Sequence, residues 1–153
     1  MNVYEKLAAA RVVLQKRELK KSGHNRFAGY DYFELRDFLN PINEIMVDLK
    51  MLGVCSFTAE EATLTIYDAE KPENFIVFHS PMADAQLKGC HAVQNLGAVQ
   101  TYLRRYLYTL AFEIVEADAL DATMGKPVKQ TDDDPLGSGY SARRLPPRGG
   151  KNE

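Results

Sequence analysis

One stretch of the chain interleaves cationic and aromatic side chains in a way that suits nucleic-acid binding. The segment from His24 to Tyr32 reads HNRFAGYDY and places Arg26 among Phe27, Tyr30 and Tyr32. Exposed rings can stack on the bases of a single strand while an arginine neutralises its phosphates. The same rings can equally fill a gap between two helices, so the pattern leaves both roles open.

A second stretch, from Ala85 to Leu110, contains no acidic residue, although the chain as a whole carries a formal net charge of −2. Its three cations are Lys88, Arg104 and Arg105. A basic surface of this kind can follow a phosphate backbone. A merely solvated basic face is the alternative interpretation.

Helical periodicity predicts which side chains of this stretch face outward. A helix over residues 92–111 places Arg105, Thr101 and Tyr108 on its outer side and Arg104 at the flank. Its apolar side is predicted to hold Val93, Leu96, Val99, Leu103, Leu107 and Leu110. The outer side would therefore be cationic and would carry hydroxyl groups.

The familiar catalytic motifs are missing from the sequence. It has no phosphate-binding loop, no dinucleotide fingerprint, no nucleophile elbow and no zinc-protease helix. The two cysteines lie too far apart for a C-x-x-C pair. We therefore expect no enzyme activity, no cofactor and no metal site.

Two weaker catalytic readings stay open. His79, Ser80 and Asp84 are close in sequence, which is weak evidence for a triad because triad members converge through the fold. A group of acidic residues after the predicted third helix could hold Mg²⁺ in a metal-dependent nuclease. Solvated acidic residues where the chain leaves a domain are the more frequent explanation. This group comprises Glu116, Asp118 and Asp121.

Composition and charge limit the class of protein. The chain has 153 residues, of which 45% are hydrophobic and 26% charged, and this fits one domain with a tail. No apolar run is long enough to span a membrane, and the N-terminus lacks a secretory signal, so we expect a soluble intracellular protein. Residues 1–36 contain eight cations and four anions, so the overall charge hides a basic N-terminal region.

The elements that must position these residues predict an α+β fold. A first helix over residues 2–21 would end in Lys16, Lys20 and Lys21, which either stabilise the helix terminus or bind phosphate. A second helix spans residues 32–52, with either a restart or a kink at Pro41. Runs at 54–58, 62–68 and 74–81 predict a three-stranded antiparallel meander, and Gly29 permits a bend in the aromatic loop.

The composition changes after residue 121. The final 32 residues hold four of the seven prolines and five of the ten glycines, and few large apolar residues. Such a segment cannot bury enough surface to offset its ordering entropy. We therefore predict a core domain over residues 1–121 and a disordered interaction tail over residues 122–153.

Two motifs in this order resemble the ERF family of single-strand annealing proteins, which are recombination proteins found mainly in bacteriophages and prophages. The first, N-x-F-x-x-Y-x-Y, is carried by Asn25, Phe27, Tyr30 and Tyr32, and an Asp37-aromatic-Leu39 step follows it. The second is the run GAVQTYLRRYLYTLAFEI, carried by Gly97, Thr101, Tyr102, Arg105 and Tyr106 and followed by Asp118 and Asp121. Glu113 departs from the pattern, because the family often has glycine there. The resemblance covers residues 3–121.

The resemblance implies a β-β-β-α core similar to that of the eukaryotic annealing proteins, and ATP-independent annealing of complementary strands. It implies that the chain acts in the cytoplasm of a bacterial host cell as a homo-oligomer, either a ring or a helical filament. The partners would be single-stranded DNA, the annealed duplex intermediate and, through the tail, a host single-strand-binding protein. The implied DNA-binding residues are Lys16, Lys20, Lys21, Arg26, Phe27, Tyr30, Tyr32, Lys88, Thr101, Arg104 and Arg105. A non-annealing adaptor protein remains the main alternative.

Overall fold

The computed structural model describes residues 1–84 and 89–116. Within these residues it contains three helices, a two-stranded sheet and a three-stranded sheet. In chain order the elements are α1 (Val3–Gln15), β1 (Gly23–Asn25), β2 (Tyr30–Tyr32), α2 (Leu35–Asp48), β3 (Met51–Phe57), β4 (Glu61–Asp68), β5 (Lys71–Pro81) and α3 (Ala92–Phe112). The α+β prediction is confirmed.

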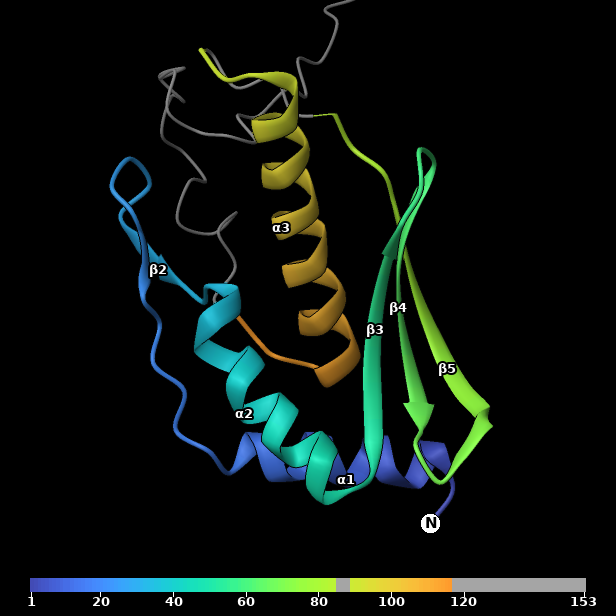
Figure 1. The fold of residues 1–153 in the computed structure, drawn as a ribbon. Helices are drawn as coiled ribbons and strands as arrows, with labels where there is room; N and C mark the ends of the chain where they lie inside the picture. Colours follow the sequence, from blue (N-terminus) through green and yellow to red (C-terminus); the bar gives the residue numbers. More distant parts are fainter. Residues whose placement is uncertain (85–88, 117–153) are drawn as a thin grey trace, which may run out of the picture.

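The three helices lie on one face of the β3-β4-β5 sheet (Figure 1). α3 runs along this face, between the sheet and the β1-β2 hairpin, and α1 crosses below it. The core forms where α1, α2 and α3 meet β4, and its largest fully buried side chains are Phe38, Phe112, Ile42, Ile45, Leu64, Ile66 and Leu107. One apolar layer therefore holds the helices to the sheet.

The meander agrees with the sequence pattern. β4 pairs antiparallel with β3 on one side and with β5 on the other. Leu64 and Ile66 are fully buried, whereas Thr63, Thr65 and Tyr67, which alternate with them, are half-buried. The predicted alternation of a packed face and a more polar face is confirmed, with each strand beginning one to three residues earlier than predicted.

The second face of the sheet has no helix over it within the described residues (Figure 1). Leu52 and Phe75 flank Tyr67 in one row across the three strands, and the Tyr67 and Phe75 rings lie 5.6 Å apart. Leu52, Phe75 and the neighbouring Val54 are exposed. The fold is therefore a one-sided sheet that leaves apolar surface in contact with water.

The first helix is shorter than predicted. α1 ends at Gln15 and has no basic residue in its last turn, so Lys20 and Lys21 do not stabilise its terminus. The apolar stripe stops at Leu14, because a further turn would present Arg17 and Glu18 to the core. The chain instead becomes extended before β1, and the lysines belong to this connecting segment.

The second helix is also shorter, but it is continuous through Pro41. Of the two alternatives at Pro41, the restart is therefore wrong. Lys50 adopts a left-handed conformation, with φ of 52°, and ends the helical region before β3. The predicted end at residue 52 is also wrong, because β3 already begins at Met51, and Gly53 within it faces the hydroxyl of Tyr108.

The end of α3 is set by Glu113, which adopts a left-handed conformation with φ of 52°. This is the position at which the resemblance expects glycine, the residue that adopts such a conformation without steric cost. Arg11 of α1 contacts this terminus: its Nε donates to the carbonyl of Ala111 at 2.9 Å, and its Nη1 lies 2.9 Å from Glu113 Oε1. The turn sends the chain back along the helix.

A buried ion pair joins α1 to the sheet. Lys6 Nζ lies 2.7 Å from Asp68 Oδ1, and each of these side chains is only 3% exposed. Glu70 accepts a second hydrogen bond from Lys6 at 2.8 Å and contacts Lys50 at 3.1 Å. The hydrogen bond with Asp68 raises the pKa of Lys6, and the same bond lowers the pKa of Asp68.

This pair predicts a loss of stability in acid. Asp68 has a pKa below its ordinary value of 3.8 when folded, so its contribution is present at neutral pH. As the pH falls below about 4.5, Asp68 is protonated in the unfolded chain before it is protonated in the folded one. Its contribution to the free energy of unfolding therefore decreases until the folded carboxylate is protonated as well. Urea unfolding of the wild type and of Asp68→Asn between about pH 6 and pH 3 should show the shallower decline in the variant. Parallel curves would contradict this linkage.

Candidate nucleic-acid interface

The aromatic loop forms a short hairpin that projects beside α3 (Figure 1). Asn25 shapes its turn: the Oδ1 atom accepts hydrogen bonds from the amides of Phe27 and Ala28, each at 3.0 Å. Gly29 completes the turn with φ of 70°, a conformation that glycine adopts readily. The hairpin was not predicted, but the bend at Gly29 was, and it is confirmed.

Arg26 and Phe27 form the tip of this hairpin and point away from the core. Arg26 is exposed, and Phe27 is 63% exposed. An arginine beside an exposed ring provides both a charge for phosphate and a surface for base stacking. The tip therefore presents a cation and a ring side by side to solvent.

Tyr30 and Tyr32 support the hairpin from its base. Their rings lie 6.3 Å apart, and the Tyr32 ring covers Gly23 on the opposite strand. A Cβ atom at position 23 would lie only 2.3 Å from this ring, so only glycine fits there. Tyr32 is therefore a packing residue in the single chain, whereas Phe27 is free to contact a ligand.

The segment before the hairpin adds cations to the same side of the chain. Lys16 and Lys20 are exposed and, like Arg26, have no ion-pair partner among the described residues. Lys21 lies 5.2 Å above the ring of Phe33. Three of the predicted cations are thus available to an anionic ligand, and the fourth is held against a ring.

The two arginines of α3 are less accessible than helical periodicity predicted. Arg104 turns toward the sheet, beside Cys55 and Tyr108, and its Nε is buried with no hydrogen-bond partner in the described part of the chain. Burial raises the pKa of the Cys55 thiol and of the Tyr108 hydroxyl, and in both cases the Arg104 charge opposes the effect. Arg104 therefore lies on the inner side of α3.

Arg105 packs against the base of the hairpin. Its guanidinium lies 4.7 Å from the centre of the Tyr32 ring and 5.7 Å from that of Tyr106. An Nη2 atom of Arg105 lies 3.5 Å from Glu116 Oε2, and the side chain is only 15% exposed. The arginine that was predicted to face outward is thus largely enclosed.

The predicted outer face of α3 needs further correction. Tyr108 is buried, with only 3% of its surface exposed, and the predicted core residues Val93, Leu96 and Leu110 are exposed. The buried set is Val99, Leu103, Leu107, Tyr108, Ala111 and Phe112. The buried residues begin only at Val99, so the first turns of α3 add nothing to the core, and near its other end Tyr108, Ala111 and Phe112 are buried in place of Leu110.

Two further residues between positions 85 and 110, Thr101 and Lys88, were predicted to bind DNA. Thr101 is exposed, and its hydroxyl donates to the carbonyl of Gly97 at 2.8 Å. Lys88 lies outside the described residues. Their roles in DNA binding stay predictions.

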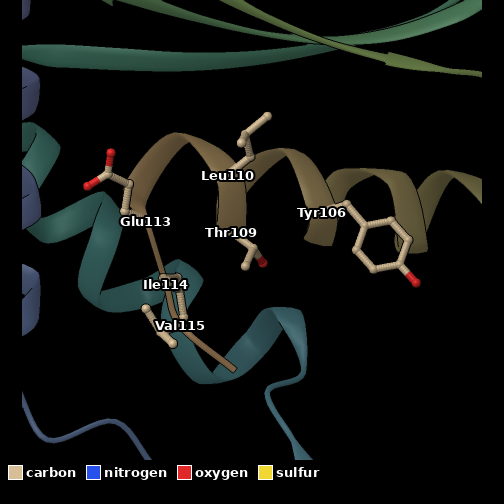
Figure 2. A pocket seen from close by; sticks show the side chains of 6 residues that line it. All are labelled: Tyr106, Thr109, Leu110, Glu113, Ile114 and Val115. Carbon is tan, nitrogen blue, oxygen red and sulfur yellow. The ribbon is translucent and has the colours of Figure 1, made fainter. Parts of the chain in front are cut away.

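A shallow apolar hollow lies beside the end of α3 (Figure 2). It is formed where the chain folds back after the helix, and its lining residues are Tyr106, Thr109, Leu110, Glu113, Ile114 and Val115. Leu110 and Val115 are exposed. This part of the helix surface is therefore apolar rather than basic.

The two alternative catalytic groupings receive no support from the described side chains. Glu116 contacts Arg105, and no cluster of three metal-ligating side chains occurs in residues 1–84 and 89–116. Asp118 and Asp121 lie outside that range. His79 Nδ1 lies 3.0 Å from Glu61 Oε2, and Ser80 donates to the carbonyl of Pro81. As successive residues of β5, His79 and Ser80 direct their side chains to opposite faces of the sheet, which does not fit a triad.

The sequence was compared with family models, curated proteins and solved structures. The family model described as the ERF superfamily matches residues 3–135. The chain belongs to the ERF superfamily. No curated protein and no solved structure gave a match.

Membership of the ERF superfamily gives the chain a role of the recombination or strand-annealing type. The match extends past the predicted domain boundary at residue 121, into residues that the structure does not describe. No described helix has the length and apolarity that crossing a bilayer would require. The division into a core and a tail stays a prediction.

Sequence reasoning missed the structural role of one residue near the candidate interface of this ERF superfamily member. Glu116 was considered only as a member of an acidic group, yet its Oε1 accepts a hydrogen bond from the amide of Phe33 at 3.2 Å. This contact links positions 83 residues apart. The only sequence signal was that the family often has glycine where this chain has Glu113, because glycine is typical of a position where a helix ends and the chain reverses.

Proposed function

We propose that this protein binds single-stranded DNA and anneals complementary strands without ATP, in homologous recombination of the phage type. The observation that carries the proposal is the ERF superfamily match over most of the chain. The exposed, ring-bearing and cationic hairpin tip supports it from the geometry. The chemistry required is binding and release, with no bond made or broken in the DNA.

The proposed contact surface consists of the hairpin tip and the segment that precedes it. Lys16, Lys20 and Arg26 neutralise phosphates, and Phe27 stacks on a base. Lys21, Tyr30 and Thr101 are proposed to support this contact surface. Lys88 and Arg104 are further candidates for phosphate contact. These contacts are independent of sequence, since every base has a stacking face.

Such a surface can promote annealing by simple physical means. Neutralising the phosphates weakens the repulsion between two strands, while stacking on one face leaves the pairing edges of the bases free to test a partner. Duplex formation then supplies the free energy that nucleotide hydrolysis supplies in other systems. This logic is consistent with the missing phosphate-binding loop.

The wider assembly is part of the same proposal. A ring or helical filament would place many hairpin tips along one strand and would raise the avidity without new contacts in each subunit. The tail over residues 122–153 would contact a host single-strand-binding protein. The protein would act in the cytoplasm of the bacterial host.

Removal of both tip side chains is expected to slow annealing about tenfold or more, because each lost base-stacking contact is worth roughly 1–3 kcal/mol. Fluorescently labelled complementary oligonucleotides would be mixed with the wild type or with Arg26→Ala/Phe27→Ala, without ATP or metal. The matched control is Lys71→Ala, which removes an exposed cation from β5, on the other side of the molecule from the hairpin (Figure 1).

The outcomes separate the candidate functions. No acceleration by the wild type would contradict annealing and would favour an adaptor protein. Equal acceleration by the double variant would overturn the site assignment but not the function. Cleavage of the DNA that appears only with Mg²⁺ would favour a nuclease.

A further inference from the structure

Arg105 sits between the hairpin and the segment that follows α3. On one side its guanidinium lies 4.7 Å from the Tyr32 ring, and on the other an Nη2 atom lies 3.5 Å from Glu116 Oε2. An arginine above a tyrosine ring is attracted to the face of the ring, and the attraction is stronger where water is excluded. The contact therefore fixes β2 against α3.

Glu116 makes a second link at the same place. Its Oε2 faces Arg105 and its Oε1 accepts the hydrogen bond of the Phe33 amide, directly after β2. The carboxylate reaches this position because the left-handed Glu113 reverses the chain and the amide of Ile114 donates to the carbonyl of Thr109 at 3.0 Å. One side chain thus bridges α3 and the base of the hairpin.

We infer that Arg105 and Glu116 are positioning residues that hold the hairpin so that Arg26 and Phe27 project at a fixed place beside α3. The DNA part of this inference rests on the proposed function. Neither residue contacts the DNA: they act through Tyr32 and Phe33, and their removal leaves the tip intact but mobile.

The accessibility of Arg105 and Arg26 supports a positioning role for the first and a phosphate-binding role for the second. Arg105 is 15% exposed, and its charge is already matched by Glu116. Arg26 is exposed and has no ion-pair partner in residues 1–84 and 89–116. A phosphate can therefore reach Arg26 without displacing another group, whereas it would have to displace Glu116 to reach Arg105.

Salt dependence separates a positioning arginine from a phosphate-binding one. For single strands the slope of log K against log salt changes by about 0.7 for each phosphate contact that is lost. Fluorescence anisotropy of a labelled oligonucleotide would be measured over a range of NaCl concentrations. Arg26→Ala should make the slope shallower by about 0.7, whereas Arg105→Ala and Glu116→Gln should leave it unchanged.

Affinity supplies the second readout. A hairpin that must be ordered on binding is expected to weaken the complex by about threefold to tenfold in both Arg105→Ala and Glu116→Gln. Arg105→Lys keeps the charge but loses the planar contact with Tyr32, so it should show the same loss. This third variant keeps the test valid if Arg105→Ala does not fold.

A measurement without DNA tests the positioning by itself. Hydrogen exchange at the amides of residues 24–33 should be faster in Arg105→Ala, Arg105→Lys and Glu116→Gln than in the wild type, and unchanged in Lys71→Ala. Unchanged exchange in all variants would overturn the inference. So would a shallower salt slope in Arg105→Ala or tighter binding by Glu116→Gln, since the first means a phosphate contact and the second a competing carboxylate. If the wild type bound no DNA, the proposed function would be overturned. Faster exchange in the three variants would still support the positioning role in that case.

Discussion

Replacement of Lys6 by methionine is expected to lower the melting temperature by roughly 10 °C, because it leaves a buried carboxylate without its partner. Asp68 is only 3% exposed and would keep only its hydrogen bonds to backbone amides, including that of Glu70 at 3.0 Å. Methionine has a similar length and adds no polar atom, so the effect reports the lost charge rather than a cavity. Thermal unfolding followed by circular dichroism measures the change.

Lys50 provides the matched control for this prediction. It contacts the same network through Glu70 at 3.1 Å, but its side chain is 65% exposed. An exposed pair is worth little, so Lys50→Met should shift the melting temperature by less than about 3 °C. Similar shifts in the two variants would mean that burial does not control the strength of this network.

Replacement of Gly23 by alanine should displace the hairpin and weaken binding of single-stranded DNA by about tenfold. The added Cβ would meet three atoms of the Tyr32 ring at 2.3–2.6 Å, so the ring must leave its place. Because Arg105 packs on the same ring, the contact between the hairpin and α3 would be lost with it. A tenfold loss corresponds to about 1.4 kcal/mol, which is about the cost of immobilising one flexible side chain on binding.

Gly97→Ala is the matched control, because a Cβ atom at position 97 would meet nothing within 4 Å beyond its chain neighbours and the nearby backbone of its own helix. That glycine lies inside α3, where alanine is the better helix former, so stability should rise slightly and DNA affinity should not change. A double-mutant cycle with Tyr32→Ala identifies the cause. If the loss at position 23 comes from the ring, it should be much smaller in the Tyr32→Ala background, and an undiminished loss would disprove the steric explanation.

The sequence predicted the elements whose pattern is local. The alternation of Leu64 and Ile66 with Thr63 and Thr65 located β4, and the meander followed from three such runs and their turns. α3 was placed to within one residue because its apolar spacing is regular over five turns. These features depend on neighbouring residues, which periodicity describes directly.

The predictions failed where distant contacts decide the outcome. The orientation of α3 was misjudged at Tyr108, which periodicity placed on the outer side but which is buried beside Arg104 and Cys55. The candidate site was predicted in its composition, with Arg26 and Phe27 at an exposed tip, but not in the packing of Arg105. That packing depends on Tyr32 and Glu116, which are far apart in the sequence and meet only after the chain reverses at Glu113.

The one-sided sheet has a thermodynamic consequence for the single chain. Leu52, Val54 and Phe75 stay exposed to water in the folded state, so unfolding adds less apolar hydration than it would for a sheet covered on both faces. Apolar exposure is what makes the heat capacity of unfolding large and positive. The stability of one chain should therefore vary less steeply with temperature, on both sides of its maximum, than that of a fully covered domain of equal length.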